Sequence, residues 1–273
     1  MLTDQEFSRI CRLAKVKYGI ELENKREIVN GRLENMIRRE GWQSYSEYMN
    51  ALETDKSGRM EKEFVNLLTT NHTFFMREFE HFEFIKKEVL PWLERTEARN
   101  KDLRIWCAAS STGEEPYTMA MLLKEYFGLE HASWDTKVLA TDLSTEVLQT
   151  AVKGIYKGEQ IQELPEQWKR RFFRQTADKE FYEVTQELKN EVIFRQFNLM
   201  DDFPFRRKMH IILLRNVMIY FDKETKQRLL EKVYDLLEPG GYLFVGKTET
   251  IERRSLAFDM VKPSIFRKTE GMR

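Results

Sequence analysis

The residues best placed to do chemistry follow two short apolar runs near the middle of the chain. The run at 103–108 leads into Ala109-Ser110-Ser111-Thr112-Gly113-Glu114-Glu115-Pro116, and the run at 137–141 leads into Asp142. Small residues let a backbone approach a ligand closely, and a carboxylate that ends the second strand can accept hydrogen bonds from ribose hydroxyls. Because two carboxylates at the start of a helix would repel a pyrophosphate, this pattern disfavours a dinucleotide.

Each of these acidic residues also has a purely structural interpretation. Glu114 and Glu115 could do no more than interact favourably with the macrodipole of the helix that they begin. Asp142 could simply cap the helix that follows it. The small-residue loop and the acidic strand end together favour an adenosyl ligand without phosphates, and S-adenosylmethionine fits this description best.

A second motif favours a different function. The segment 241–248, Gly-Tyr-Leu-Phe-Val-Gly-Lys-Thr, matches the letters GxxxxGK[ST] of a phosphate-binding P-loop. Such a loop wraps a phosphate with exposed backbone amides, whereas the four residues between these glycines are bulky and typical of a strand. We expect Glu238-Pro239-Gly240-Gly241 to form a turn and 242–245 to form a buried strand, so a P-loop nucleotide hydrolase is the less favoured alternative.

Other chemistries and other classes of protein have less support. The histidines at 72, 81, 131 and 210 lack the spacing of metal ligands, so no metal is expected, and Cys107 is expected to be a buried thiol. Forty-five Lys and Arg balance 45 Asp and Glu, which argues against capture of nucleic acid or of an anionic membrane by the whole chain. The sequence lacks a secretory signal and a long apolar run, so we expect a cytoplasmic protein with no direct membrane insertion.

Hydrophobic periodicity divides the chain into a helical part and an alternating part. Apolar residues recur at helical spacing over 1–90, and a linker is expected at 91–102. In the remaining part, 103–273, short apolar runs alternate with helical segments, which predicts an α/β domain with a parallel sheet covered on both faces. The expected strands are 103–108, 137–142, 192–197, 210–214 and 242–245, and the expected helices include 7–14, 28–37 (ended by Gly41), 64–68, 116–127 and 229–237.

One segment departs from this alternation. Residues 172–188 contain Phe181-Tyr182-Glu183-Val184-Thr185, which is typical of a short strand. We expect short antiparallel strands here, forming a small β insertion at about 170–190, before the third strand of the sheet.

Four segments, taken in order, resemble the chemotaxis receptor methyltransferases, the CheR family. They are Asn71-His72-Thr73-Phe74-Phe75-Met76-Arg77-Glu78, Ser111-Thr112-Gly113-Glu114-Glu115-Pro116-Tyr117, Ala140-Thr141-Asp142 and Arg215-Asn216-Val217-Met218-Ile219-Tyr220-Phe221. The family transfers a methyl group from S-adenosylmethionine to glutamate side chains of chemoreceptors. Because the likeness covers nearly the whole chain, it implies a Rossmann-like methyltransferase domain with the β insertion, preceded by an all-α domain.

The resemblance also implies roles for individual residues. Arg77 and Tyr220 correspond to residues of the catalytic centre, although spacing alone would favour a core position for Tyr220. The family pattern assigns cofactor contacts to Asn71, Thr73, Arg77, Glu115, Asp142, Asn198, Leu199, Asn216 and Val217. The expected product is S-adenosylhomocysteine. One departure is Ser110-Ser111, where relatives often carry Ala or Cys before Ser.

The partner implied by the resemblance is the cytoplasmic helical domain of chemoreceptors. The protein itself is expected to be a monomer. At about 100° per residue, Lys25, Arg32 and Arg39 fall within roughly 40° of one another on one helix face. This basic stripe is either an ordinary solvated face or a docking site for an acidic receptor surface. Some relatives dock a receptor's C-terminal pentapeptide on a longer β insertion, so the short insertion here argues against that mode. The alternative to an active enzyme is a non-catalytic, cofactor-sensing adaptor.

Overall fold

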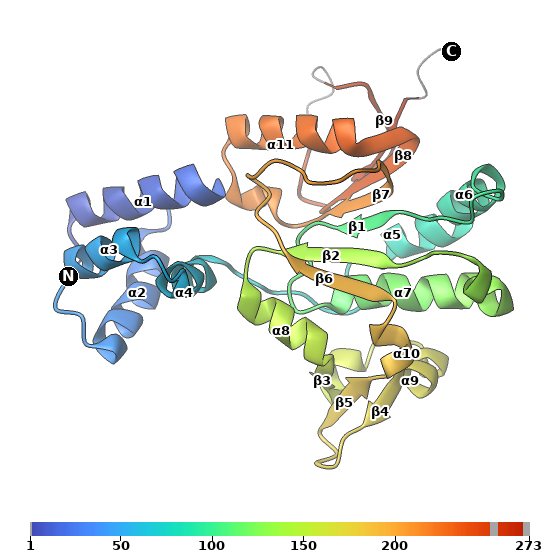
Figure 1. The fold of residues 1–273 in the computed structure, drawn as a ribbon, viewed down its shortest axis with the longest axis horizontal. Helices are drawn as coiled ribbons and strands as arrows, with labels where there is room; N and C mark the ends of the chain where they lie inside the picture. Colours follow the sequence, from blue (N-terminus) through green and yellow to red (C-terminus); the bar gives the residue numbers. More distant parts are fainter. Residues whose placement is uncertain (1, 252–255, 270–273) are drawn as a thin grey trace.

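The computed structural model describes residues 2–251 and 256–269 and contains a helical bundle beside an α/β domain (Figure 1). The bundle consists of α1 (Asp4–Tyr18), α2 (Arg26–Glu40), α3 (Tyr45–Thr54) and α4 (Arg59–Leu68). Thr3 and Glu6 form a reciprocal capping box at the start of α1. Gly41 ends α2, as predicted, and does so in the left-handed conformation with a φ of 79°. The periodicity therefore identified three of these helices, and α3 was not predicted.

A seven-stranded sheet forms the centre of the second domain. Its strand order is β6-β2-β1-β7-β8-β10-β9, and the first five of these strands run parallel while β10 is antiparallel to both of its neighbours. The parallel strands confirm the predicted fold class. The strands are β1 (Ile105–Cys107), β2 (Val138–Asp142), β6 (Val192–Gln196), β7 (Met209–Leu214), β8 (Leu237–Val245), β9 (Phe258–Lys262) and β10 (Ile265–Lys268).

Each face of the sheet packs against a hydrophobic core. Successive side chains of a strand point to opposite faces, so neighbouring residues belong to different cores. Ile105 and Cys107 of β1 belong to one hydrophobic core, and Trp106 between them belongs to the other. Helix α7 (Glu114–Phe127) covers the first face and α11 (Lys223–Leu236) covers the second (Figure 1). Between β2 and β6 the chain forms α8 (Thr145–Lys153), α9 (Glu166–Phe172) and α10 (Gln186–Lys189). No helix within the described ranges is both long and apolar enough to cross a membrane.

The predicted β insertion is a separate three-stranded antiparallel sheet. Its strands are β3 (Ile155–Lys157), β4 (Phe173–Gln175) and β5 (Phe181–Val184), in the order β3-β5-β4. Strands β4 and β5 lie where antiparallel strands were expected, whereas β3 was not predicted.

The segment Glu238–Gly241 is not the turn that we expected. It lies inside β8, and the register of β8 against β7 shifts in this region, where Gly240 has a φ of 80°. The segment is therefore an irregularity within a strand and not its beginning. Residues 242–245 continue the same strand and pair with β7 and with β10, so their amides belong to a sheet and do not form the phosphate cradle of a P-loop.

Packing also indicates where along the sequence the first domain ends and the second begins. The helical run formed by α5 (Phe79–Phe84), a π turn at Ile85–Val89 and α6 (Leu90–Thr96) buries its apolar side chains in the same core as β1 and α7. Because these helices cover the sheet, the packing favours a division near residue 70 over the predicted one at residue 90 with a linker at 91–102.

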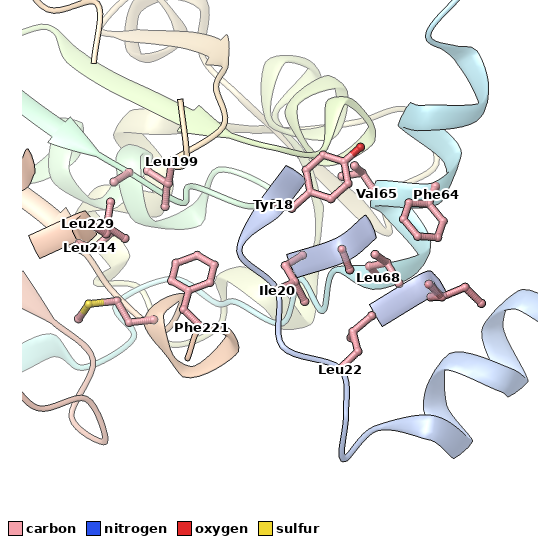
Figure 2. Close-up of a cluster of buried hydrophobic side chains, with 14 of the residues drawn as sticks. Tyr18, Ile20, Leu22, Phe64, Val65, Leu68, Leu199, Leu214, Phe221 and Leu229 are labelled. Carbon is pink, nitrogen blue, oxygen red and sulfur yellow. The ribbon is translucent and has the colours of Figure 1, made fainter. Parts of the chain in front are cut away.

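A continuous hydrophobic cluster joins the bundle to the sheet domain (Figure 2). Tyr18 and Ile20 belong to the same cluster as Phe221 and Leu229. Ile20 also forms an antiparallel bridge with Phe221, and the amide of Glu21 donates a 2.8 Å hydrogen bond to the carbonyl of Tyr220. The end of α1 is therefore held directly against the segment that follows β7.

Gly19 lies at this junction and provides a test of it. Gly19 ends α1 with φ of 71°, and a Cβ there would lie 2.6 Å from Sδ of Met200 and 2.9 Å from Cγ2 of the buried Thr225. We expect Gly19→Ala to lower the free energy of unfolding by about 1–2 kcal/mol for the left-handed backbone and by about 1–3 kcal/mol more for overpacking. Urea unfolding measures the sum of the backbone cost and the overpacking cost.

Gly41→Ala is the matched control, because Gly41 ends α2 with a φ of 79° and a Cβ there has no described atom within 4 Å. This variant should show the backbone cost alone. Equal losses of unfolding free energy in the two variants would contradict close packing at the junction.

Candidate active site

A cavity opens at the carboxyl ends of β1, β2, β6 and β7, between the sheet and the bundle, where ligands of open parallel sheets bind. Tyr18, Ile20 and Leu68 of the bundle region form part of its wall. The residues expected at the cofactor site and catalytic centre also line this cavity: Asn71, Thr73, Arg77, Glu115, Asp142, Asn198, Leu199, Asn216, Val217 and Tyr220.

Asp142 ends β2, and its carboxylate is already held by backbone groups. The amide of Ser111 donates to Oδ2 and the amide of Ser144 donates to Oδ1, each at 2.9 Å. Burial raises the pKa of Asp142, and these amides act against that increase. A carboxylate has lone pairs for further donors, so Asp142 can accept additional hydrogen bonds from a molecule in the cavity.

The small-residue loop after β1 brings three segments together. Ser111 has a φ of 46°, its amide donates to Asp142, and its hydroxyl donates a 2.9 Å hydrogen bond to the carbonyl of Asn71. The loop therefore ties the end of β2 to the segment that leaves the bundle. Ala108 and Ala109 leave this part of the cavity wall without large side chains.

A buried ion cluster lies at the end of β7. Nη1 of Arg215 is 2.7 Å from Oε2 of Glu115, and Nη2 is 3.2 Å from Oε2 of Glu78. Nη2 also donates to the carbonyl of Arg77. Arg215 exposes only 2% of its side chain, so the ion pairs are largely shielded from water.

Burial shifts the acidity of both carboxylates in this cluster. It raises the pKa of Glu115, although Arg215 counteracts the increase. For Glu78, burial would raise the pKa, but Arg215 and the amide of Lys247 outweigh it and the pKa is lowered. Glu115 is therefore the carboxylate of the cluster that takes up a proton first as the pH falls.

The two residues assigned to catalysis lie at the side of the cavity nearest the bundle. Nη1 of Arg77 donates to the carbonyl of His72 at 2.8 Å, and its guanidinium lies 5.8 Å from the ring centroid of Phe74. The hydroxyl of Tyr220 is 3.3 Å from the carbonyl of Thr70. Tyr220 is half-buried and lines the cavity, so it is not the core residue that spacing alone favoured.

The three residues of the basic stripe have different surroundings, and all lie outside the cavity lining. Lys25 places Nζ 4.8 Å from the ring centroid of Tyr220. Arg32 donates to the carbonyls of Leu67 and Thr69 at 2.9 and 3.0 Å, where it satisfies the end of α4. Arg39 is exposed and pairs with its neighbour Glu40. Lys25 precedes the first residue of α2, so the helical wheel does not apply to it, and of the three side chains only Arg39 is exposed.

Cys107 is buried, as we expected, and two of the four histidines, His81 and His210, are buried as well. Burial lowers the pKa of His81 and of His210 to about 4. Cys107 is buried beside Glu115, and burial raises the pKa of its thiol. Within 2–251 and 256–269, no group of three His, Cys, Asp or Glu side chains is arranged to hold a metal ion.

Sequence reasoning did not assign roles to Arg215, Glu78 or Glu249. Arg215 and Glu78 stand inside quoted motifs, and Glu249 directly follows the P-loop-like letters. Glu249 accepts hydrogen bonds from the amides of Asn216, Ile219 and Gly246. Arg215 could have been found from sequence, because it is a charged residue directly before Asn216, which the family pattern assigns to the cofactor site. For Glu249, the signal was an acidic residue just after a buried strand.

Comparisons with known proteins agree with this architecture. Residues 5–69 match the family model described as CheR methyltransferase, all-alpha domain, and residues 71–266 match CheR methyltransferase, SAM binding domain. The chain is similar to three proteins named chemotaxis protein methyltransferase. The one from Borreliella burgdorferi is 38% identical over 98% of this chain and 95% of the relative; the one from Salmonella typhimurium is 37% identical, over 97% and 90%; and the one from Escherichia coli is 39% identical, over 93% and 88%.

The fold and these matches define an S-adenosylmethionine-dependent methyltransferase. More specifically, the chain belongs to the CheR methyltransferase family, because the two family models together cover nearly all of it.

The ion cluster generates a prediction about stability. Arg215→Met leaves Glu115 buried without its cation, and removing one partner of a buried pair costs about 3–5 kcal/mol of unfolding free energy. Because the pKa of Glu115 is already raised and would rise further, the folded variant binds a proton more readily than the unfolded chain. The loss measured by urea unfolding should therefore be smaller at pH 5 than at pH 7.5.

Arg207→Met serves as the control, since Arg207 is exposed and pairs with Asp102 at the surface. It should cost no more than about 1 kcal/mol. A loss of similar size for Arg215→Met, or one that is independent of pH, would show that the cluster is not an electrostatic unit.

Proposed function

We propose that this protein transfers the methyl group of S-adenosylmethionine to glutamate side chains of chemoreceptors, forming glutamate methyl esters and S-adenosylhomocysteine. The observation that carries the proposal is that the residues of the family pattern converge on one cavity at the carboxyl ends of the parallel strands. Family membership and the named relatives support the activity. A non-catalytic adaptor has no comparable support.

The residues of the cavity suit such a cofactor. Asp142 has free acceptor capacity for ribose hydroxyls. Leu143, Leu199 and Val217 offer apolar surface for a flat base, and the small side chains of Ala108 and Ala109 let a ligand approach the backbone. Among the lining residues the carboxylates of Asp142 and Glu115 balance the guanidiniums of Arg77 and Arg215, and Arg215 is already paired with Glu115 and Glu78, so the lining offers a phosphate no net positive charge.

The bound cofactor supplies an electrophilic methyl group on a sulfonium that is already a good leaving group. A glutamate side chain, with a reference pKa of about 4.3, is ionised at neutral pH, so the protein has no proton to remove from it. What remains is alignment and exclusion of water. Arg77, half-buried at the cavity wall, can hold a carboxylate through charge-assisted hydrogen bonds.

Tyr220 complements Arg77. Its hydroxyl now donates to the carbonyl of Thr70 over a long 3.3 Å, so a substrate oxygen that arrives in the cavity could compete for this proton donor. We assign it the orientation of the attacking carboxylate oxygen. No metal ion takes part in the reaction as proposed.

The partner is the helical cytoplasmic domain of a chemoreceptor, which a monomer in the cytoplasm would meet. Of the basic stripe, Lys25 lies closest to the site, against the ring of Tyr220, and Arg39 is the most exposed. These positive charges suit an acidic receptor helix. The β insertion is not assigned a role in capturing a receptor pentapeptide.

Binding of S-adenosylhomocysteine tests the cofactor site. Asp142→Ala should weaken binding by about 1.5–3 kcal/mol, roughly tenfold to 150-fold, because a desolvated hydrogen bond to a charged group is lost. Isothermal titration calorimetry measures the affinity. The control is Glu146→Ala, an exposed acidic residue in the first turn of α8. Equal affinity of Asp142→Ala and the wild type would refute the ribose assignment.

The catalytic assignment is tested by kinetics. Tyr220→Phe removes only the hydroxyl and should lower kcat for methyl transfer about tenfold or more, with little change in affinity for S-adenosylhomocysteine. The measurement is the transfer of labelled methyl from the cofactor to a receptor fragment as a base-labile ester. Tyr126→Phe is the control, because its hydroxyl binds Glu94 and lies outside the cavity lining. An unchanged kcat for Tyr220→Phe would remove Tyr220 from the mechanism.

A further inference from the structure

Glu249 is a buried carboxylate that lies outside the cavity lining but binds the backbone of a loop that does line it. Its side chain accepts three hydrogen bonds from backbone amides. Oε2 accepts from Asn216 at 2.8 Å and from Gly246 at 2.6 Å, and Oε1 accepts from Ile219 at 3.2 Å. Glu249 is 7% exposed, so these bonds are shielded from water.

The loop that Glu249 holds carries much of the proposed site. Asn216 and Val217 line the cavity, and Met218–Tyr220 form a single 3₁₀ turn that ends in Tyr220. Asn216 has a φ of 57°, a left-handed conformation that costs free energy for a residue with a side chain. The amide of Ile219 lies in the first turn, where a helix supplies no acceptor of its own. Among the described residues, Glu249 supplies that acceptor.

Gly246 shows how closely these groups approach. A Cβ at this position would lie 2.4 Å from Nδ2 of Asn216 and 2.9 Å from Oε2 of Glu249. The close approach of Asn216 and Glu249, and not backbone conformation, therefore favours glycine here. This accounts for one glycine of the P-loop-like segment without any phosphate.

We propose that Glu249 is a positioning residue for methyl transfer, an inference that rests on the proposed function. Its carboxylate binds the backbone of the loop 216–220 and so holds Asn216 and Tyr220, which both line the cavity, in place. Glu249 itself touches neither cofactor nor substrate. Its effect on the reaction passes through backbone amides alone.

The two carboxylate oxygens serve different parts of the loop. Oε2 holds Asn216 and Gly246, and Oε1 holds the turn that leads to Tyr220. In Glu249→Gln only one oxygen remains, and the amide NH₂ cannot accept a hydrogen bond. Keeping the oxygen on Asn216 and Gly246 retains two bonds and gives up the one to Ile219. The variant should therefore release Tyr220 while it leaves Asn216 in place.

The experiment compares Glu249→Gln with Glu224→Gln, the same chemical change at an exposed glutamate in the first turn of α11. Methyl transfer is measured with labelled S-adenosylmethionine and a purified cytoplasmic chemoreceptor fragment. Calorimetry measures S-adenosylhomocysteine affinity, and amide hydrogen exchange follows individual residues. In Glu249→Gln we expect kcat to fall about tenfold and affinity to change less than about threefold. The Ile219 amide should lose protection while the Gly246 amide keeps it.

A second variant addresses the other half of the loop. Gly246→Ala keeps both carboxylate oxygens of Glu249, but its Cβ presses most closely on the side chain of Asn216 and less closely on Oε2 of Glu249. Here we expect the affinity for S-adenosylhomocysteine to fall by a larger factor than kcat, the reverse of the pattern for Glu249→Gln. This variant also keeps the inference open to test if Glu249→Gln does not fold.

The inference is overturned if Glu249→Gln matches the wild type in kcat, or if kcat and cofactor affinity fall equally in both variants, as general destabilisation would cause. A wild-type protein that binds S-adenosylhomocysteine but transfers no methyl group would instead contradict the proposed function. The hydrogen-exchange pattern separates these cases, because it reports on the bond between Glu249 and Ile219 without any substrate.

Discussion

The guanidinium of Arg215 is the interaction on which the site depends most. It follows β7 and reaches Glu115 at the start of α7 and Glu78 in the segment that leaves the bundle. One buried cation therefore joins three stretches of chain that are far apart in sequence. A buried charge without its partner is strongly destabilising. The ion pairs that assemble this side of the cavity are therefore also needed for a stable fold. Glu249 likewise joins two separate stretches of chain next to Asn216, but its partners are backbone amides and not a charged side chain.

Much of the architecture could be predicted from sequence because it follows from local pattern. Buried parallel strands are short apolar runs, and all five predicted runs are strands of the sheet. Once these strands are parallel, their carboxyl ends share an edge, so Asp142 at the end of β2 and Asn216 after β7 lie at the same edge of the sheet. The convergence of the expected site residues on one cavity follows from this topology together with the family pattern.

The remaining features depend on partners that are remote in sequence. Periodicity predicted helices up to residue 90 and a linker at 91–102, but it could not show that the helices from 79 onward pack on the sheet and not in the bundle. Strand β3 was missed because it has three residues, of which only Tyr156 is buried. A helical wheel treats Arg32 as solvated and cannot show the carbonyls of Leu67 and Thr69 beside it. Glu249 is least visible of all, since its partners are backbone amides that every sequence possesses.

The bridge between Ile20 and Phe221 has a consequence for how such proteins diversify. The bundle is not a detachable module, because it supplies Tyr18 and Ile20 to the cavity wall and bonds to the backbone carbonyl of Tyr220. If the bundle were replaced by that of a distant homologue, the residues at the end of α1 would therefore no longer fit the loop that holds Tyr220. Sequence change in the bundle must preserve these contacts with the loop, so it is expected to concentrate on the outer faces of the bundle helices.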